Sequence, residues 1–223
     1  DYVQRDLVIR DTLADEGQVA SSLALDIDSP DVWVRNIPPF GTSGAGVTDP
    51  DYSTTLTHVT AGPHQEPLKD SKRYIYARVS NFGIDFANLD AKVRFYVVLS
   101  NPGTQLKFPD HFDDAGNVAA GTAGVKLLGV VLLNAGDIPK SIGTHSAGTM
   151  SYTTISSKIV HIEWPIDTVE ENTSLETTIL VEVTPHDGKF LGPNGEGDLI
   201  AYNNNLTRKK VVFRDGIHIR GTG

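Results

Sequence analysis

The chain has 223 residues, of which 39% are hydrophobic and 21% charged, and it contains no cysteine. This composition can close a globular core without disulfides or thiolate-bound metal. Its 28 acidic residues outnumber 19 lysines and arginines, and the net charge of −9 disfavours binding to nucleic acid. Because no run of about eighteen apolar residues occurs, we expect no membrane insertion.

Strand signals dominate the chain, and no segment keeps a helical apolar period over three turns. Turn residues such as Pro38-Pro39 and Asn101-Pro102-Gly103 separate the apolar runs. Eight or nine strands without intervening helices predict an all-β fold, an antiparallel β-sandwich with long loop insertions and extended terminal segments. The predicted strands cover 6–10, 31–37, 73–81, 91–99, 125–133, 149–155, 158–164, 177–183 and 206–213, and a weaker one covers 216–220.

Period-two alternation within these strands predicts which residues form the core. In 73–81 the aliphatic residues alternate with Tyr74 and Tyr76, and in 91–99 they alternate with charged residues such as Arg94. We expect the aliphatic set to face inward and the other set to face outward. The predicted core contains Val32, Val34, Ile75, Ala77, Val79, Val93, Phe95, Val97, Ile179 and Val181.

Three segments are too long and too polar for tight turns, namely 38–72, 105–122 and 185–198. Long loops of this kind are where binding sites are usually built. The last segment holds hard oxygen ligands on a glycine-rich backbone, as Ca²⁺ prefers. It lacks oxygen ligands at two positions that an EF-hand fills, so an acidic hairpin loop without metal remains the alternative. The candidate calcium ligands are Asp187, Asn194, Glu196 and Asp198, with weaker candidates at Asp110–Asp114 and at Asp26, Asp28 and Asp31.

Three short motifs resemble the CARDB-like immunoglobulin-type modules of bacteria and archaea. They are Pro30-Asp31-Val32-Trp33-Val34, the strand and turn Val79-Ser80-Asn81-Phe82-Gly83, and Asn203-Asn204-Asn205 before the last strand. The resemblance covers residues 29–213, with two insertions that the compact modules lack. It implies an immunoglobulin-like sandwich at 29–213, preceded by an N-terminal arm or added strand at 1–28 and followed by an extension at 214–223.

Motifs for catalysis are absent from the sequence. The seven histidines are scattered singly without metalloprotease spacing, and no G-x-S-x-G occurs. The glycine-rich stretch Gly41–Gly46 lacks the strand-to-helix setting of a phosphate-binding loop. A hydrolase that uses two carboxylates remains a remote alternative, because such a pair has no fixed spacing in sequence. We therefore expect a protein that is not an enzyme.

The resemblance implies a structural, adhesive or assembly module at the cell surface or outside the cell, whose partner is another protein or further copies of the chain. The alternative is a carbohydrate-binding module, whose glycan ligand would stack on Tyr74 and Tyr76 and could require Ca²⁺. Both tryptophans, Trp33 and Trp164, lie in apolar strands and are expected in the core. The sequons Asn172–Ser174 and Asn205–Thr207 match the acceptor pattern for N-glycosylation.

The terminal segments predict a mode of self-association. The strand-like residues 6–10 and 216–220 lie outside the sandwich that the internal strands complete. Such segments need a sheet edge to pair with. One possibility is strand addition to a neighbouring copy, and the equal alternative is that each segment folds back on its own sheet.

Overall fold

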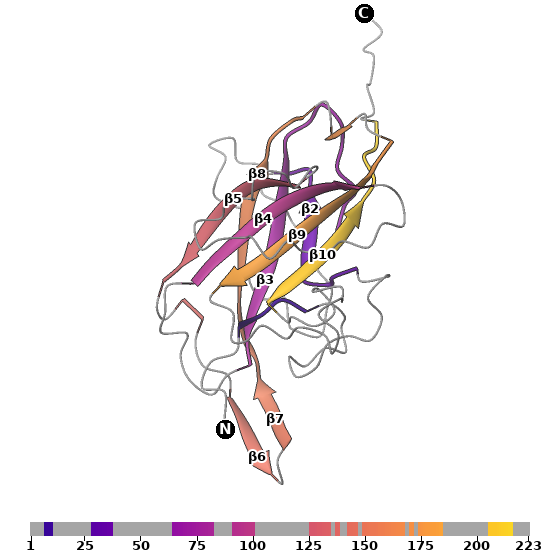
Figure 1. Cartoon of the computed structure of the whole chain (residues 1–223). Coiled ribbons are helices and arrows are strands. Elements are labelled where there is room, and N and C mark those ends of the chain that lie inside the picture. Colours follow the sequence, from indigo (N-terminus) through magenta and orange to yellow (C-terminus); the bar gives the residue numbers. More distant parts are fainter. Residues whose placement is uncertain are drawn as a thin grey trace, which may run out of the picture.

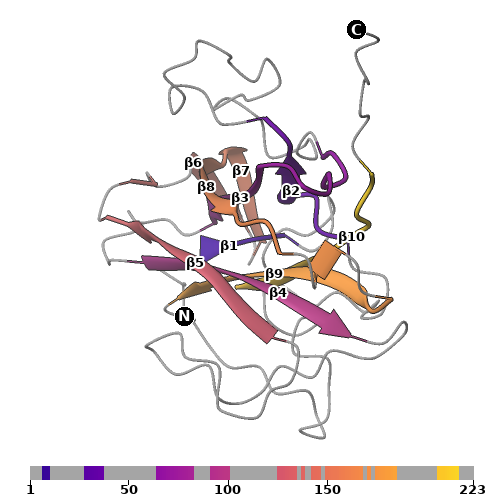
Figure 2. The same ribbon diagram turned by 90° about the horizontal axis from the view of Figure 1, so that it is seen from above.

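The structure is a computed structural model that describes residues 7–10, 28–37, 64–82, 91–100, 125–134, 137–138, 142–146, 149–167, 170–171, 174–184 and 205–215. In this part of the chain the protein is all-β, and helical conformation is confined to one turn at Glu170 and Glu171. Two antiparallel sheets face one another, and Figures 1 and 2 show the two layers. The predicted fold class, an antiparallel β-sandwich, is confirmed.

The first sheet is built around β3 (Arg73–Asn81). Strand β8 (Ser156–Trp164) pairs with β3 over its whole length on one side. On the other side β2 (Val32–Arg35) and β1 (Leu7–Val8) pair with successive parts of β3. The N-terminal segment therefore adds a strand to its own sheet, which is one of the two alternatives considered for it. Residues 216–220 lie outside the described residues.

The second sheet has the strand order β10-β9-β4-β5, and all of its pairs are antiparallel. The two central strands are β9 (Glu176–Thr184) and β4 (Ala91–Ser100). The two edges are β10 (Leu206–Val211) and β5 (Val125–Leu133). β10 lies beside β2 of the first sheet, and β5 lies beside β8.

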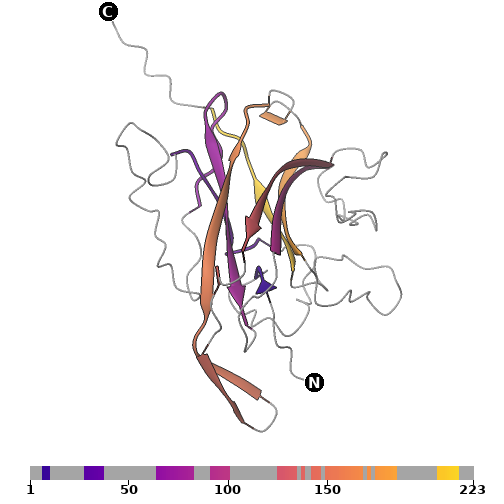
Figure 3. The same ribbon diagram turned by 90° about the vertical axis from the view of Figure 1, so that its left-hand side faces the viewer.

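A two-stranded hairpin, β6 (Ile142–Ser146) and β7 (Thr149–Thr154), precedes β8. Its strands pair with each other, and within the described part of the chain they join neither large sheet. Figure 3 shows the hairpin projecting beyond the end of the sandwich. The sequence predicted the second of these strands but not the first.

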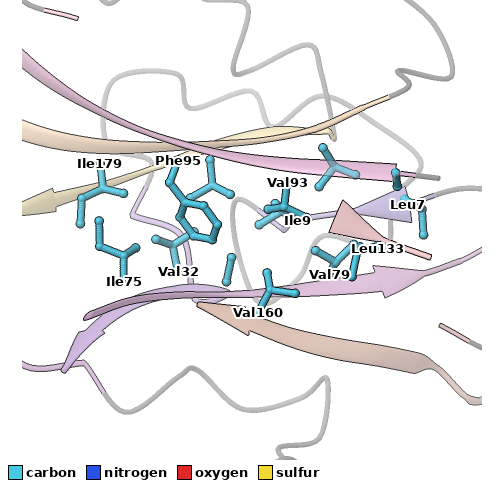
Figure 4. Packing of buried hydrophobic residues seen from close by; sticks show 14 of the residues in the cluster. Leu7, Ile9, Val32, Ile75, Val79, Val93, Phe95, Leu133, Val160 and Ile179 are labelled. Atoms are coloured by element: carbon cyan, nitrogen blue, oxygen red, sulfur yellow. The ribbon is translucent and has the colours of Figure 1, made fainter. Parts of the chain in front are cut away.

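The core lies between the two sheets (Figure 4). All ten residues predicted from period-two alternation belong to one buried cluster there, so that prediction is confirmed. Phe95 and Ile179 come from one sheet and Ile75 and Val160 from the other. Ile9, which follows β1, is also fully buried in this cluster. Removal of this much apolar surface from water is the main source of stability for such a domain.

The outward faces do not match the expectation of a solvated surface. Arg78, Arg94 and Tyr96 point away from the core, yet each is no more than 2% exposed. Their polar groups find partners on these faces: Arg94 donates to Glu182 at 3.4 Å, and the Tyr96 hydroxyl donates to the same carboxylate at 3.0 Å. Buried polar side chains are tolerated when they find such partners.

Candidate interaction surface

The four strand edges of the sandwich lie in two pairs, and one pair is closed by the chain itself. On the β2–β10 side, the segment 64–69 runs past both strands. The Gln65 N–H donates to the Val34 carbonyl of β2, and beyond β10 the Arg214 N–H donates to the Pro67 carbonyl, both at 2.9 Å. These bonds occupy backbone groups that an open edge would offer to another chain.

Side chains complete the closure of the β2 edge. The Val34 N–H of β2 donates to Nδ1 of His64 at 3.2 Å. Asn36, just after β2, accepts from the Leu68 N–H at 3.0 Å and donates to the Glu66 carbonyl at 2.9 Å. Side-chain groups that bond to edge backbone compete with strand addition. We therefore exclude this side as a docking edge.

On the opposite side, charged side chains guard the edge strand β8. Lys158, on the core-facing register of β8, pairs with Asp137 at 2.8 Å. The hydrogen bond from Lys158 lowers the pKa of Asp137, and a second one from the Asn134 N–H adds to the effect. Glu163 near the end of β8 pairs with Lys72 at 3.6 Å. Charges placed in this way are a common means of keeping an edge strand from pairing with another chain.

The neighbouring edge strand β5 is different, because it is apolar on both faces. Its cross-strand partners show that Val131 and Leu133 face the core, whereas Val130 and Leu132 face outward. Val130 is 43% exposed and Leu132 is 62% exposed. Among the described residues, no strand pairs with the outer edge of β5. An exposed apolar edge strand of this length is a template for pairing with another chain.

One charged residue, Lys126, stands near the start of β5. Its ammonium group binds Asp167 at 2.7 Å and Glu170 at 3.1 Å. Partial burial acts in the opposite direction, but the hydrogen bonds to both carboxylates raise the pKa of Lys126 above its usual value. Glu170 also accepts from the Trp164 indole N–H at 2.7 Å. The ammonium group of Lys126 is therefore paired within the chain, and it ties the start of β5 to the residues that follow β8.

The remainder of β5 is held closely against the first sheet. A Cβ at Gly129 would lie 3.4 Å from Cγ2 of Ile162 on β8, so the backbone of β5 lies within van der Waals reach of that side chain. Leu128 and Val131 pack against the core cluster. The inner side of β5 is therefore well packed, and within the described segments its outer edge has no partner strand.

The predicted aromatic platform is not exposed, and this expectation was wrong. Tyr76 is fully buried and Tyr74 is 9% exposed. The Tyr76 ring stacks on Trp33 with centroids 5.6 Å apart and planes 3° apart, and the centroid of the His161 ring lies 5.5 Å from that of Tyr76. Trp33 is buried as predicted, but it lies in this outer-face cluster, whereas Trp164 lies in the main core.

The main calcium candidates, Asp187, Asn194, Glu196 and Asp198, lie outside the described residues, as do 110–114 and Asp26. Among the weaker candidates, Asp31 is occupied by Arg10 and Arg78, and Asp28 pairs with Lys209 at 2.8 Å. Arginine and lysine therefore supply the positive charge at these two carboxylates. Within the described segments, no group of three or more metal-ligating side chains comes together.

The sequon at Asn205 is buried. Asn205 is 1% exposed, and its side-chain amide donates to the Leu7 carbonyl. Asn205 thus caps the N-terminal strand from the start of β10. An amide held in this way is unsuitable as a glycan acceptor. The acceptor of the other sequon, Asn172, lies outside the described residues.

Comparison of the chain with protein-family models, with curated proteins and with solved structures yields no match. In the described part of the chain, no helix is long and apolar enough to cross a membrane. The β5 edge was missed in the sequence as a site. The available signal was the run of apolar residues at 125–133, in which the outward positions are as apolar as the inward ones.

Proposed function

We propose that this protein is a non-enzymatic structural or assembly module of immunoglobulin-like, CARDB type, located at the cell surface or outside the cell, and that it associates with copies of itself through a sheet edge. The observation that carries the proposal is the exposed apolar outer side of β5, with Val130 and Leu132. The other three edges are engaged by chain segments or guarded by charge.

This assignment follows from the risk that an open apolar edge pairs with other chains. Proteins that remain monomeric blunt their edges with charges, prolines or covering segments. The chain does so at β2, β8 and β10 but leaves β5 apolar between Leu127 and Leu133. An edge that lacks this protection, when the other edges have it, is expected to serve in binding another chain. The absence of catalytic motifs from the sequence and the resemblance to CARDB-like modules support the non-enzymatic assignment.

The carbohydrate-binding alternative loses its proposed platform. Tyr74 and Tyr76 were its stacking residues, and neither ring offers a face to solvent. A glycan array with and without a calcium chelator tests this alternative. We expect no saccharide signal in either condition, and a strong one would favour the carbohydrate-binding assignment instead.

Sedimentation velocity from micromolar to near-millimolar concentration tests the proposal itself. We expect the sedimentation coefficient to rise with concentration. Because each copy carries a net charge of −9, repulsion between copies should weaken association at low ionic strength, and added salt should strengthen it. A single monomeric species at every concentration and salt condition would contradict self-association.

A further inference from the structure

Among the residues that the structure describes, nothing pairs with the outer edge of β5, so one more strand can add there. It is the last strand of a four-stranded sheet, and its outward residues Val130 and Leu132 are the most exposed apolar side chains of that sheet. An added strand would satisfy edge backbone groups and cover both side chains. The open question is which chain supplies that strand.

The charge pattern of β5 favours a second copy of the same chain. Between Leu127 and Leu133 the strand carries no charged residue, although the whole chain has a net charge of −9. Two copies that meet along this strip therefore place no like charges opposite one another. A basic partner would find no opposite charge on this segment to bind, whereas an identical apolar strand can pack against it. Self-complementary surfaces of this kind form two-fold symmetric dimers.

The alternation of the side chains and the length of the regular segment together determine the register. Because side chains alternate, paired residues of adjoining strands must point to the same side of the joined sheet. A two-fold axis at Val131 meets this condition: Val130 lies opposite Leu132 of the second copy, and Gly129 lies opposite Leu133. The bulge opposite Phe95 and Tyr96 breaks the alternation beyond Gly129, which limits the matched segment to 129–133.

We infer that β5 of one copy pairs antiparallel with β5 of a second copy across a two-fold axis at Val131. The inference rests on the proposed self-association and names the strand and the register. The two four-stranded sheets then join into one sheet of eight strands, four from each copy. Val130 and Leu132 of both copies are covered in one apolar cluster on its outer side.

A charge-swap experiment tests the identity of the occupant. The variants Val130→Lys/Leu132→Lys and Val130→Glu/Leu132→Glu each place like charges opposite one another, so each alone should associate at least about tenfold more weakly than the natural chain. When the two variants are mixed, opposite charges face each other and association should return. A misfolded variant would not be rescued by its counterpart. Val212→Lys, at a residue that is 66% exposed and outside β5, is the control and should associate like the natural chain.

Cysteine cross-linking tests the register, because the chain has no other thiol. Under mild oxidation, a mixture of Val130→Cys and Leu132→Cys chains should form more disulfide-linked dimer than either variant alone. Equal cross-linking of Val130→Cys with itself would overturn the axis at Val131. If the natural chain associates but the charge variants associate equally well and the mixture shows no gain, the β5 inference fails, while self-association itself stands and must use another surface. If the natural chain is monomeric throughout, the proposed function itself fails.

Discussion

The guanidinium group of Arg10 holds the carboxylate of Asp31 with two hydrogen bonds of 2.8 Å, from Nε to Oδ2 and from Nη2 to Oδ1. The two side chains are 2% and 0% exposed. Arg78 of β3 donates to the same carboxylate through Nε at 2.8 Å. One buried acidic group therefore ties the N-terminal segment and the start of β2 to the central strand of the first sheet.

We expect Asp31→Asn to be strongly destabilising. The substitution leaves two buried guanidinium groups without their counter-charge, and breaking a buried ion pair in this way costs about 3–5 kcal/mol. Urea denaturation measures the loss. The matched control is Asp28→Asn, whose carboxylate pairs with Lys209 and is 56% exposed, so that its loss should stay below about 1 kcal/mol. Equal and small losses for the two variants would contradict the role given to Asp31.

Stability should fall in mildly acidic solution. Burial lowers the pKa of His64 below its usual 6.5, and nearby Lys209 adds to this effect against the opposing influence of Glu66. Burial also lowers the pKa of His161. The folded chain therefore binds these protons less readily than the unfolded chain, so the contribution is fully present above about pH 6.5 and is lost as the pH falls below it.

The chemistry at His64 gives this loss a local cause, because protonation of Nδ1 removes the acceptor of the Val34 N–H. Urea denaturation at about pH 7.5 and about pH 5.5 measures the effect. The double variant His64→Asn/His161→Gln should lose less stability between these two conditions than the natural chain. An identical loss in both proteins would show that other groups control the acid response.

Replacement of Tyr76 distinguishes a buried ring from an exposed platform. Tyr76→Ala removes a fully buried side chain stacked on Trp33, and removal of a large buried aromatic residue costs about 3–5 kcal/mol. The control Val212→Ala lies at an exposed residue and should change stability by no more than about 0.5 kcal/mol. Thermal or urea unfolding that showed no difference between the two variants would place Tyr76 at the surface.

The core was predictable because alternation reports it directly. In β3 and β4, apolar residues such as Ile75 and Phe95 occupy every second position. Antiparallel sheets commonly bury one face, so these positions face the core. The sequence also indicated the strand order along the chain, since turn residues separate the apolar runs. These are local signals that need no knowledge of which strands become neighbours.

The outward faces and the sheet edges were not predictable, because both depend on contacts between distant residues. Alternation places Arg78 and Arg94 outside the core, but whether they meet water or a carboxylate depends on Asp31 and Glu182, which lie 47 and 88 residues away in the chain. In the same way, the apolar run of β5 suits a central strand as well as an edge strand. Only the strand order of the folded sheet places it at the edge.

Hydrogen exchange measured by mass spectrometry at low and high protein concentration tests the central claim most directly. If β5 pairs with β5 of a second copy, the backbone amides of 129–133 should gain protection as the concentration rises. Those of β10, at the opposite edge of the same sheet, should exchange at an unchanged rate. Association detected by sedimentation with no added protection in 129–133 would contradict the account.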